Sequence, residues 1–425
     1  MSAPGAGAAG ALAGVRVIEL ASERAAFAGK LLADLGADVI VVEPPEGHAT
    51  RRYGPFLDDQ PGPDRSLWWW YYNTSKRSVV LDLETPAGAG AFRSLAASAD
   101  IVLEGADPGS LAALGIDHVD VRAERPELIW ASVTPFGRTG TRKDEPATDL
   151  TLLAGGGPMW SCGYDDHTLP PVRPGENQGL HIAGAFAAMS ALTALLYRDA
   201  GGAGQHIDVS MHAAANVTTE MGSVEWLVEQ ATVQRQTGRH AMVEPTMQVQ
   251  VQAGDGRYVT TGFPPSEARD YQSLLDWMDE LGVREQFDER ALLELGISLG
   301  GIDPRTIAND PVAAEIYGAG RAALTFIASK VGAYEFFCGA QDRDFQCGIV
   351  YSPDEALGDK HFRERGFDVP VRHDEFDRTI SYPGAPFKLS ASPWRIRSRA
   401  PLVGEHTAQV LAELADSGSH TVSAE

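Results

Sequence analysis

The sequence predicts an α/β protein, with a large Rossmann-like domain on a parallel sheet and a smaller α+β domain after it. The first observation is a β-α-β pattern, in which apolar runs at 14–20 and 38–43 flank a helical pattern that stops at Gly36. The second is that this alternation of strand and helix continues to residue 137. The third is the polar–apolar alternation around Gly254-Asp255, which indicates a hairpin later in the chain.

The remaining elements of the first half follow in order. Strands and helices continue to alternate, with strands expected at 78–83, 100–105 and 127–137, a helix at 86–99, and a short helix before Gly115. No GxGxxG motif follows the first strand, where the chain reads LASERAAFAG, and this argues against a dinucleotide cofactor. Residues 179–204 are apolar almost all round until Tyr197, so we expect a buried helix that ends at Gly201 and Gly202, followed by a strand at 205–211.

The second half is less regular. It contains two helical patterns at 269–282 and 311–337, then loops and short strands to about residue 390, and one amphipathic C-terminal helix. These elements suggest a flexible leader, two domains and a linker. The ranges are 1–13 for the leader, 14–215 completed by 395–425 for the large domain, 216–245 for the linker and 246–394 for the small domain.

The composition is that of a globular protein with a substantial core, 44% hydrophobic and 22% charged. With 35 Lys and Arg against 58 Asp and Glu, the formal net charge of −23 argues against binding to nucleic acid or to an anionic membrane. Three cysteines without metal-ligand spacing predict free thiols in a reducing compartment, and no apolar run is long enough to span a membrane. The first residues lack the basic start of a signal peptide, so we expect a cytoplasmic protein.

Seven stretches are the basis of a family resemblance. They are LLADLGADVIVVEPP, NTSKRSVVLDLETPAG, ADIVLEGADPGSLAALGI, PELIWASVTPFGRTG, ATDLTLLAGGGPM, GGAGQHIDVSM and PLVGEHTAQVL. In this order, nearly from end to end, the chain resembles the family III CoA-transferases. That group includes the formyl-CoA, carnitine and benzylsuccinate CoA-transferases and the α-methylacyl-CoA racemases. Only residues 285–320 look like an insertion.

The resemblance implies a dimer of two interlocked rings. It also implies a reaction that moves CoA from an acyl-CoA, such as succinyl-CoA, to a carboxylic acid. In the family an aspartate attacks the thioester, becomes a mixed anhydride and then carries CoA as a thioester. Backbone N–H groups of a glycine-rich loop stabilise the developing oxyanion. The CoA thioester is then a substrate, and we expect no separate cofactor and no metal.

The aspartate that the resemblance implies is missing from this chain. In the family it stands five residues after a loop glycine and four before a helix glycine. Counting forward from Gly175 and back from Gly184 gives position 180 in both cases, and the GAGQ stretch at 202–205 keeps the same register. Residue 180 is leucine, which can be neither a nucleophile nor a base.

Other positions also depart from the family's pattern. The first loop reads RAAF at 24–27 and is one residue shorter, and Val41 stands where a basic residue is common. Gly-Ala at 105–106 replaces an asparagine and an aromatic residue that touch CoA in the family. Asn73 and Lys76 remain as candidate CoA contacts. Lys76 could meet the CoA phosphates as a point charge, or it could be a solvated surface lysine.

Three interpretations of residues 172–184 compete. Glu176 could replace the aspartate from four positions earlier, although errors of ~1 Å can cost ~100-fold in covalent catalysis, or it could only stabilise the start of a helix. His181 could be the general base of a racemase or lyase variant, or it could be structural. In the third interpretation, which we favour, the chain is the non-catalytic half of a heteromer. Its partner is then a homologous subunit with the aspartate, as in heteromeric benzylsuccinate-type enzymes.

These interpretations imply different partners. The favoured one implies a heterodimer or heterotetramer, whereas a self-sufficient transferase or racemase using Glu176 or His181 would be a homodimer. In each case the small-molecule partners are an acyl-CoA and a carboxylic acid. A non-catalytic acyl-CoA-binding protein is a further alternative.

Four weaker candidates complete the sequence-based hypotheses. The aromatic block at 68–73 is an interface packing element or a wall for an aromatic acyl group. Cys162 is a small buried thiol or, without support from a motif, a nucleophile. The triplet at 165–167 is a solvated loop rather than a metal site, because adjacent residues do not converge on one ion. Asp149 is expected to act at a helix N-terminus.

Overall fold

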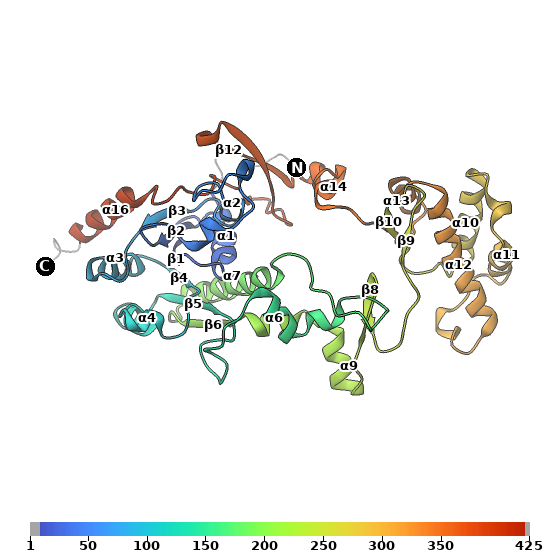
Figure 1. The fold of residues 1–425 in the computed structure, drawn as a ribbon, viewed down its shortest axis with the longest axis horizontal. Coiled ribbons are helices and arrows are strands. Elements are labelled where there is room, and N and C mark those ends of the chain that lie inside the picture. Colours follow the sequence, from blue (N-terminus) through green and yellow to red (C-terminus); the bar gives the residue numbers. More distant parts are fainter. Residues whose placement is uncertain (1–8, 421–425) are drawn as a thin grey trace. The chain divides into compact units, whose positions relative to one another are not determined.

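The structure is a computed structural model that describes residues 9–420. These residues form two compact units. Unit 1 consists of residues 173–221 together with the segments before residue 160 and after residue 356, and unit 2 consists of residues 160–172 and 222–356. Figure 1 labels the elements of both units along the chain.

A six-stranded sheet forms the centre of unit 1, in the order β3-β2-β1-β4-β5-β6, and every neighbouring pair is parallel. This confirms the predicted α/β class. The strands are β1 (Arg16–Leu20), β2 (Asp38–Glu43), β3 (Arg77–Val80), β4 (Ile101–Glu104), β5 (Ile129–Thr134) and β6 (His206–Ser210). The strand order reverses direction between β1 and β4, and this topological switch point is where open α/β sheets bind their ligands.

Helices cover both faces of this sheet (Figure 1). The helices of unit 1 are α1 (Ala26–Asp34), α2 (Leu67–Tyr72), α3 (Pro86–Ala97), α4 (Ser110–Ala113), α5 (His118–Glu124), α6 (Asp149–Gly156), α7 (Gln178–Asp199), α8 (Met211–Val217), α15 (Lys360–Arg365) and α16 (Thr407–His420). Successive residues of β1 point to opposite faces. Val17 belongs to the core under α1 and α7, and Ile18 to the core under α3 and α16.

Helix α7 is less buried than predicted, although it ends close to the predicted stop at Gly201 and Gly202. It ends at Asp199, because the chain turns at Gly201 with a positive φ of 95°. One face packs on α1 and β5, but Met189 is 55% exposed and Leu196 is 74% exposed. Within the described residues α7 is the one helix long and apolar enough to cross a membrane, and half of its apolar window is buried inside the protein.

The NTSKRS stretch builds a buried polar network in unit 1. The Lys76 ammonium lies 2.7 Å from the Glu19 carboxylate and donates to Asn73 Oδ1 and to the Ala26 carbonyl, both at 3.0 Å. Burial raises the pKa of Glu19 and lowers that of Lys76, while the ion pair opposes both shifts. A Cβ at Gly29 would lie 1.7 Å from Glu19 Oε2, so α1 can pass the pair only with glycine there.

The segment 357–394, assigned to the small domain by sequence, lies in unit 1. Its strands β12 (Asp368–His373) and β13 (Arg378–Pro383) form an antiparallel hairpin. His373 stacks on Trp70 of α2 at 4.0 Å between ring centroids, and this aromatic contact attaches the hairpin to unit 1. The C-terminal helix α16 also packs on unit 1, where Glu413 pairs with Arg77.

Unit 2 combines helices with small antiparallel sheets. Its elements are α9 (Met221–Glu229), β7 (Gln234–Gln236), β8 (Arg239–Met242), β9 (Gln250–Gln252), β10 (Tyr258–Thr260), α10 (Ala268–Glu280), α11 (Arg290–Ser298), α12 (Pro311–Lys330), α13 (Ala333–Gln341) and β11 (Gly348–Ile349), and α14 (Pro353–Leu357) follows at its end. The hairpin predicted around Gly254 is present as β9 and β10. Residues 216–245, expected as a linker, contain α9 and the β7–β8 hairpin.

One helix predicted in unit 2 is two helices. The pattern at 311–337 divides into α12 and α13, because the Val331 carbonyl turns away to accept the Gly254 N–H at 2.8 Å. Asp255 then caps α13 by accepting the Ala333 N–H at 3.0 Å. A tertiary contact with the β9–β10 turn therefore interrupts a continuous helical pattern.

The buried pair predicts a strong double-mutant coupling. Lys76→Met leaves the Glu19 carboxylate buried without its cation, which should lower the free energy of unfolding by about 3–5 kcal/mol. The double variant Glu19→Gln/Lys76→Met removes both charges and should be more stable than Lys76→Met alone. Urea denaturation of the wild type, of Glu19→Gln, of Lys76→Met and of the double variant measures this coupling. Additive losses of unfolding free energy would show that the two side chains are not coupled.

Candidate functional site

The N-terminus of α7 is the region in which the family places its acid. Asp149, the first residue of α6, accepts the Leu180 N–H with Oδ1 at 3.1 Å. A Cβ at Gly179 would lie 2.7 Å from the same oxygen, so glycine makes room for this contact. Asp149 therefore lies at a helix N-terminus, as expected. It begins α6, and it also caps the N-terminus of α7.

Leu180 does not project a reactive group from this helix start. Its side chain is 6% exposed and belongs to the apolar core shared with Leu152 and Ala183. The nearby carboxylate of Asp149 is 10% exposed, and its Oδ2 receives no hydrogen bond from the described residues. The Arg173 guanidinium stands 4.0 Å from Oδ2, beyond hydrogen-bond reach. The start of α7 thus combines the apolar side chain of Leu180 with the largely buried carboxylate of Asp149.

His181 is held by aromatic neighbours. Its Nε2 lies 2.7 Å from the Tyr72 hydroxyl, and its ring centroid is 4.4 Å from that of Phe27. Burial lowers the pKa of His181 and raises the pKa of Tyr72. The neutral imidazole therefore accepts a hydrogen bond from the protonated Tyr72 hydroxyl. Nε2 of His181 is therefore engaged by Tyr72.

Glu176 lies in the loop before α7 and is exposed. Its φ of 56° places a non-glycine residue in the left-handed region, and its carbonyl accepts a hydrogen bond from the Arg173 guanidinium. The structure therefore brings Leu180, His181 and Asp149 together at the start of α7, with the Glu176 carboxyl outside the core.

Asn73 and Lys76 are buried, and the structure places them away from solvent. Lys76 is 2% exposed and bonded to Glu19, so its ammonium is not presented to a phosphate, and it is not a surface lysine either. Asn73 accepts from Lys76 and donates its side-chain N–H to the Trp69 carbonyl at 3.0 Å. Neither predicted CoA contact is favoured by this geometry.

The weaker candidates have structural partners. In the aromatic block, Trp69 donates to the Pro401 carbonyl at 3.1 Å and lies under the Arg51 guanidinium, 3.8 Å from its ring centroid. Burial raises the pKa of Cys162, which disfavours a thiolate. In the 165–167 triplet, Asp165 pairs with Arg239 in unit 2. Among residues 9–420, no three His, Cys, Asp or Glu side chains come together as metal ligands.

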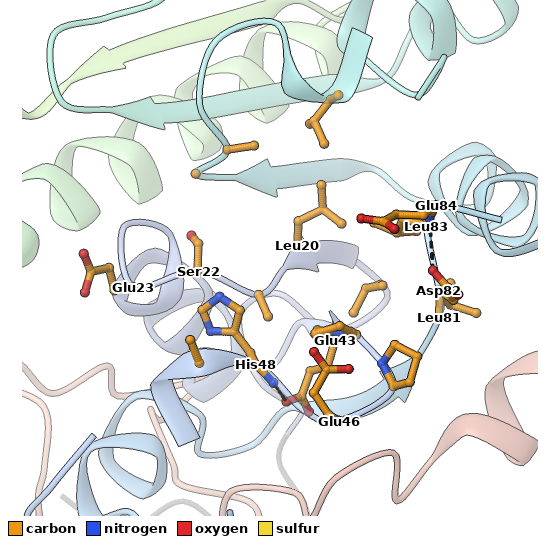
Figure 2. A pocket seen from close by; sticks show the side chains of 18 of the residues that line it. Leu20, Ser22, Glu23, Glu43, Glu46, His48, Leu81, Asp82, Leu83 and Glu84 are labelled. Carbon is orange, nitrogen blue, oxygen red and sulfur yellow. Dashed lines mark hydrogen bonds between the residues drawn. The ribbon is translucent and has the colours of Figure 1, made fainter. Parts of the chain in front are cut away.

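A cavity of about 740 Å³ opens at the carboxyl ends of β1, β2, β3 and β4, at the topological switch point. Figure 2 shows its side chains, with Glu43, Glu46 and His48 on and after β2 and Asp82 and Glu84 after β3. Its acidic lining also includes Glu23 and Asp107. Of this lining, Arg24 and the 105–106 stretch were singled out from the sequence. The carboxylates placed just after successive parallel strands could also have indicated the site.

One side of the cavity is closed by a bridge across the switch point. Arg24 donates to the Gly105 carbonyl at 2.8 Å and to Asp107 Oδ1 at 2.7 Å. A Cβ at Gly105 would lie 2.4 Å from Ser22 Oγ and 2.9 Å from Arg24 Cβ, so a larger residue does not fit. The shortened first loop and the glycine at 105 are thus two parts of one packing arrangement.

The parallel sheet, the cavity at its switch point and the central helix with a carboxylate at its start define a Rossmann-like α/β protein of the ligand-binding class. The sequence model of CoA-transferase family III matches residues 12–407. The chain therefore belongs to family III of the CoA-transferases.

Three known proteins of this family are similar to the chain over nearly its whole length. Subunit BbsE of succinyl-CoA:(R)-benzylsuccinate CoA-transferase from Thauera aromatica is 32% identical over 94% of this chain and 93% of its own length. The β subunit of succinyl-CoA–L-malate CoA-transferase from Chloroflexus aurantiacus is 29% identical over 95% and 94%. The crystal structure of a CAIB/BAIF family protein from Brucella suis has a TM-score of 0.77 and 25% identity, covering 96% of this chain and 100% of that one.

The packing at position 180 predicts the effect of restoring an acid. Leu180→Asp removes core packing and places a second carboxyl beside Asp149, so it should lower the free energy of unfolding by about 3 kcal/mol or more. Burial and the like charge should raise the folded-state pKa of the introduced carboxyl above its unfolded value. The unfolded chain then loses its proton first, and the variant becomes less stable as pH rises through that interval.

Leu180→Asn is the matched neutral control. The Asp and Asn variants should have similar stability near pH 4, and the Asp variant should fall below the Asn variant by pH 8. Urea denaturation at both pH values measures the difference. Equal stability at pH 8 would mean that position 180 opens to solvent and tolerates an ionised acid.

Proposed function

We propose that this chain is the subunit of a heteromeric family III CoA-transferase that lacks the nucleophile. The observation that supports this is Leu180, whose side chain is core packing at the position of the family's aspartate. The similar proteins from Thauera and Chloroflexus are both described as subunits, and their names give succinyl-CoA as donor. The proposed reaction moves CoA from an acyl-CoA such as succinyl-CoA to a carboxylic acid.

In this proposal the partner is a homologous chain with an aspartate at the corresponding position. The partner's carboxylate would attack the thioester carbonyl and release CoA as a thiolate. The thiolate would attack the aspartyl carbonyl of the mixed anhydride, which forms an aspartyl-CoA thioester and releases the donor acid as a carboxylate. The acceptor carboxylate would then displace CoA from this thioester, and the thiolate would attack the acceptor carbonyl of the second anhydride, which gives the new acyl-CoA and restores the aspartate. The CoA thioester is a substrate, and no separate cofactor enters. The three cysteines are free thiols, which fits a reducing cytoplasm.

An open apolar face supports contact with another chain. Met189, Leu192 and Leu196 of α7, together with Leu31 and Trp394, line an apolar groove of about 550 Å³ on unit 1. Exposed apolar surface of this kind is typical of protein–protein contacts. The interlocked-ring arrangement, as a heterodimer or heterotetramer, would cover it.

The self-sufficient alternatives are less well supported by the geometry. His181 accepts a hydrogen bond from Tyr72 with the nitrogen that would take a proton. Glu176 has an exposed carboxyl on a loop, so it remains the one candidate nucleophile of this segment that solvent reaches. A direct test must therefore distinguish Glu176 from a partner's acid.

The first test is CoA transfer by the purified chain, alone and after addition of a related chain from the same organism with aspartate at this position. Succinyl-CoA is the donor, a panel of carboxylic acids provides acceptors, and borohydride trapping with mass analysis locates any acyl adduct. We expect no transfer by the chain alone and transfer by the mixture, with the adduct on the partner. An adduct on Glu176 would contradict the proposal.

Glu176→Gln should leave the turnover of the mixed assembly within about twofold of wild type. The side chain lies outside the core, and in the proposed mechanism it forms no covalent bond with the substrate. His181→Gln provides the matched control within the buried cluster and should reduce stability. Initial rates with succinyl-CoA measure the first effect. Loss of turnover in Glu176→Gln, with unchanged assembly, would assign the chemistry to this chain.

A further inference from the structure

We propose that the switch-point cavity of unit 1 excludes the phosphorylated nucleotide end of CoA, so that CoA in the assembly is held by the partner subunit. The second half of this statement rests on the proposed function. The first half concerns this chain alone. It follows from the charges of the cavity, from its backbone donors and from the bridge that closes one side of it.

Position and size would suit a nucleotide. The cavity lies outside the carboxyl ends of parallel strands at the switch point, where doubly wound sheets bind dinucleotides and mononucleotides. Its volume of about 740 Å³ is within the range of ligand pockets. Exclusion must therefore come from chemistry rather than from lack of space.

The charges of the lining oppose a phosphate. Six carboxylates line the cavity, from Glu23, Glu43, Glu46, Asp82, Glu84 and Asp107, whereas its basic side chains are Arg24 and His48. Arg24 is already bonded to Asp107, and burial lowers the pKa of His48, which keeps its imidazole neutral near pH 7. Arg51, behind the lining, is 1% exposed and forms a bidentate pair with Glu43. Among the described residues of the lining, Arg24 is thus paired and His48 is neutral, so phosphates would face a mainly acidic lining.

Four backbone donors around the cavity are also occupied. A nucleotide site at a switch point relies on free N–H groups of loops and helix starts. Here four such groups donate to side chains of the protein itself: Ala25 to Ser22, His48 to Glu43, Glu84 to Asp82 and Ala106 to Glu104, at 2.6–3.1 Å. Three of the four acceptors are carboxylates, so the protein's own acids stand where phosphate oxygens would accept.

The bridge across the switch point completes the exclusion. Arg24 reaches from the loop after β1 to the loop after β4, where it binds the Gly105 carbonyl and Asp107. The crevice between the two strand ends is therefore spanned by an ion pair. An incoming diphosphate would have to break this pair while facing the remaining carboxylates.

Calorimetric titration of the purified chain tests the proposal. The ligands are CoA and adenosine 3′,5′-bisphosphate, and pantetheine is the reference without phosphate. We expect no saturable binding of either phosphorylated ligand up to about 1 mM. The double variant Glu46→Lys/Glu84→Lys should then bind CoA at least about tenfold more tightly than wild type, with an affinity that falls as salt is added.

The matched control is Glu315→Lys/Glu335→Lys, which changes the net charge equally at two exposed positions on α12 and α13 of unit 2. This control should bind CoA no better than wild type. Circular dichroism confirms folding of each variant. Micromolar binding of CoA to the wild-type chain, displaced by the bisphosphate, would overturn the proposal, and so would equal behaviour of the two double variants.

The outcome is independent of the test of the proposed function, because binding is measured without turnover. A chain that binds CoA but transfers nothing alone would refute only the exclusion. An adduct trapped on this chain during transfer would refute the proposed function.

Discussion

The buried ion pair between Glu19 and Lys76 is the interaction on which the arrangement of unit 1 depends. A charge removed from water is unfavourable unless a partner and further hydrogen bonds surround it, so β1, α1 and residues 73–76 must meet in one geometry. α1 satisfies this geometry because residue 29 has no side chain. With α1 in this position, Phe27 contacts His181, and Arg24 in the loop before α1 contacts Gly105. Both the helix start and the cavity owe their shape to this pair.

The start of α7 carries a buried carboxylate and an apolar side chain at position 180. The N-terminus of a long helix favours an anion, and Asp149 supplies one by accepting the Leu180 N–H. Since that carboxylate is nine-tenths buried, it stabilises the helix without being offered to solvent. The leucine side chain then joins the core. The start of α7 thus combines a stabilising anion with apolar core packing.

The strands and most helices of unit 1 could be predicted because their apolar periodicity is local. What failed depended on tertiary contacts. Lys76 looked accessible in a polar stretch, but its burial is decided by Glu19, 57 positions earlier. The helix at 311–337 divides because of a turn at Gly254. At the candidate site, counting glycines located Leu180, whereas the acidity of the cavity arises from strand ends that only the parallel sheet brings together.

The close packing at Gly105 also has an evolutionary consequence. Any side chain at this position would meet Ser22 Oγ at 2.4 Å and Arg24 Cβ at 2.9 Å. A single substitution at 105 is therefore blocked until the first loop has changed, and Arg24 in turn is held by the Gly105 carbonyl. The two loops therefore constrain each other, and a larger residue at 105 would require Ser22 and Arg24 to move. A new ligand specificity at this edge of the sheet would therefore have to accommodate the contacts of Arg24 with Gly105 and Asp107.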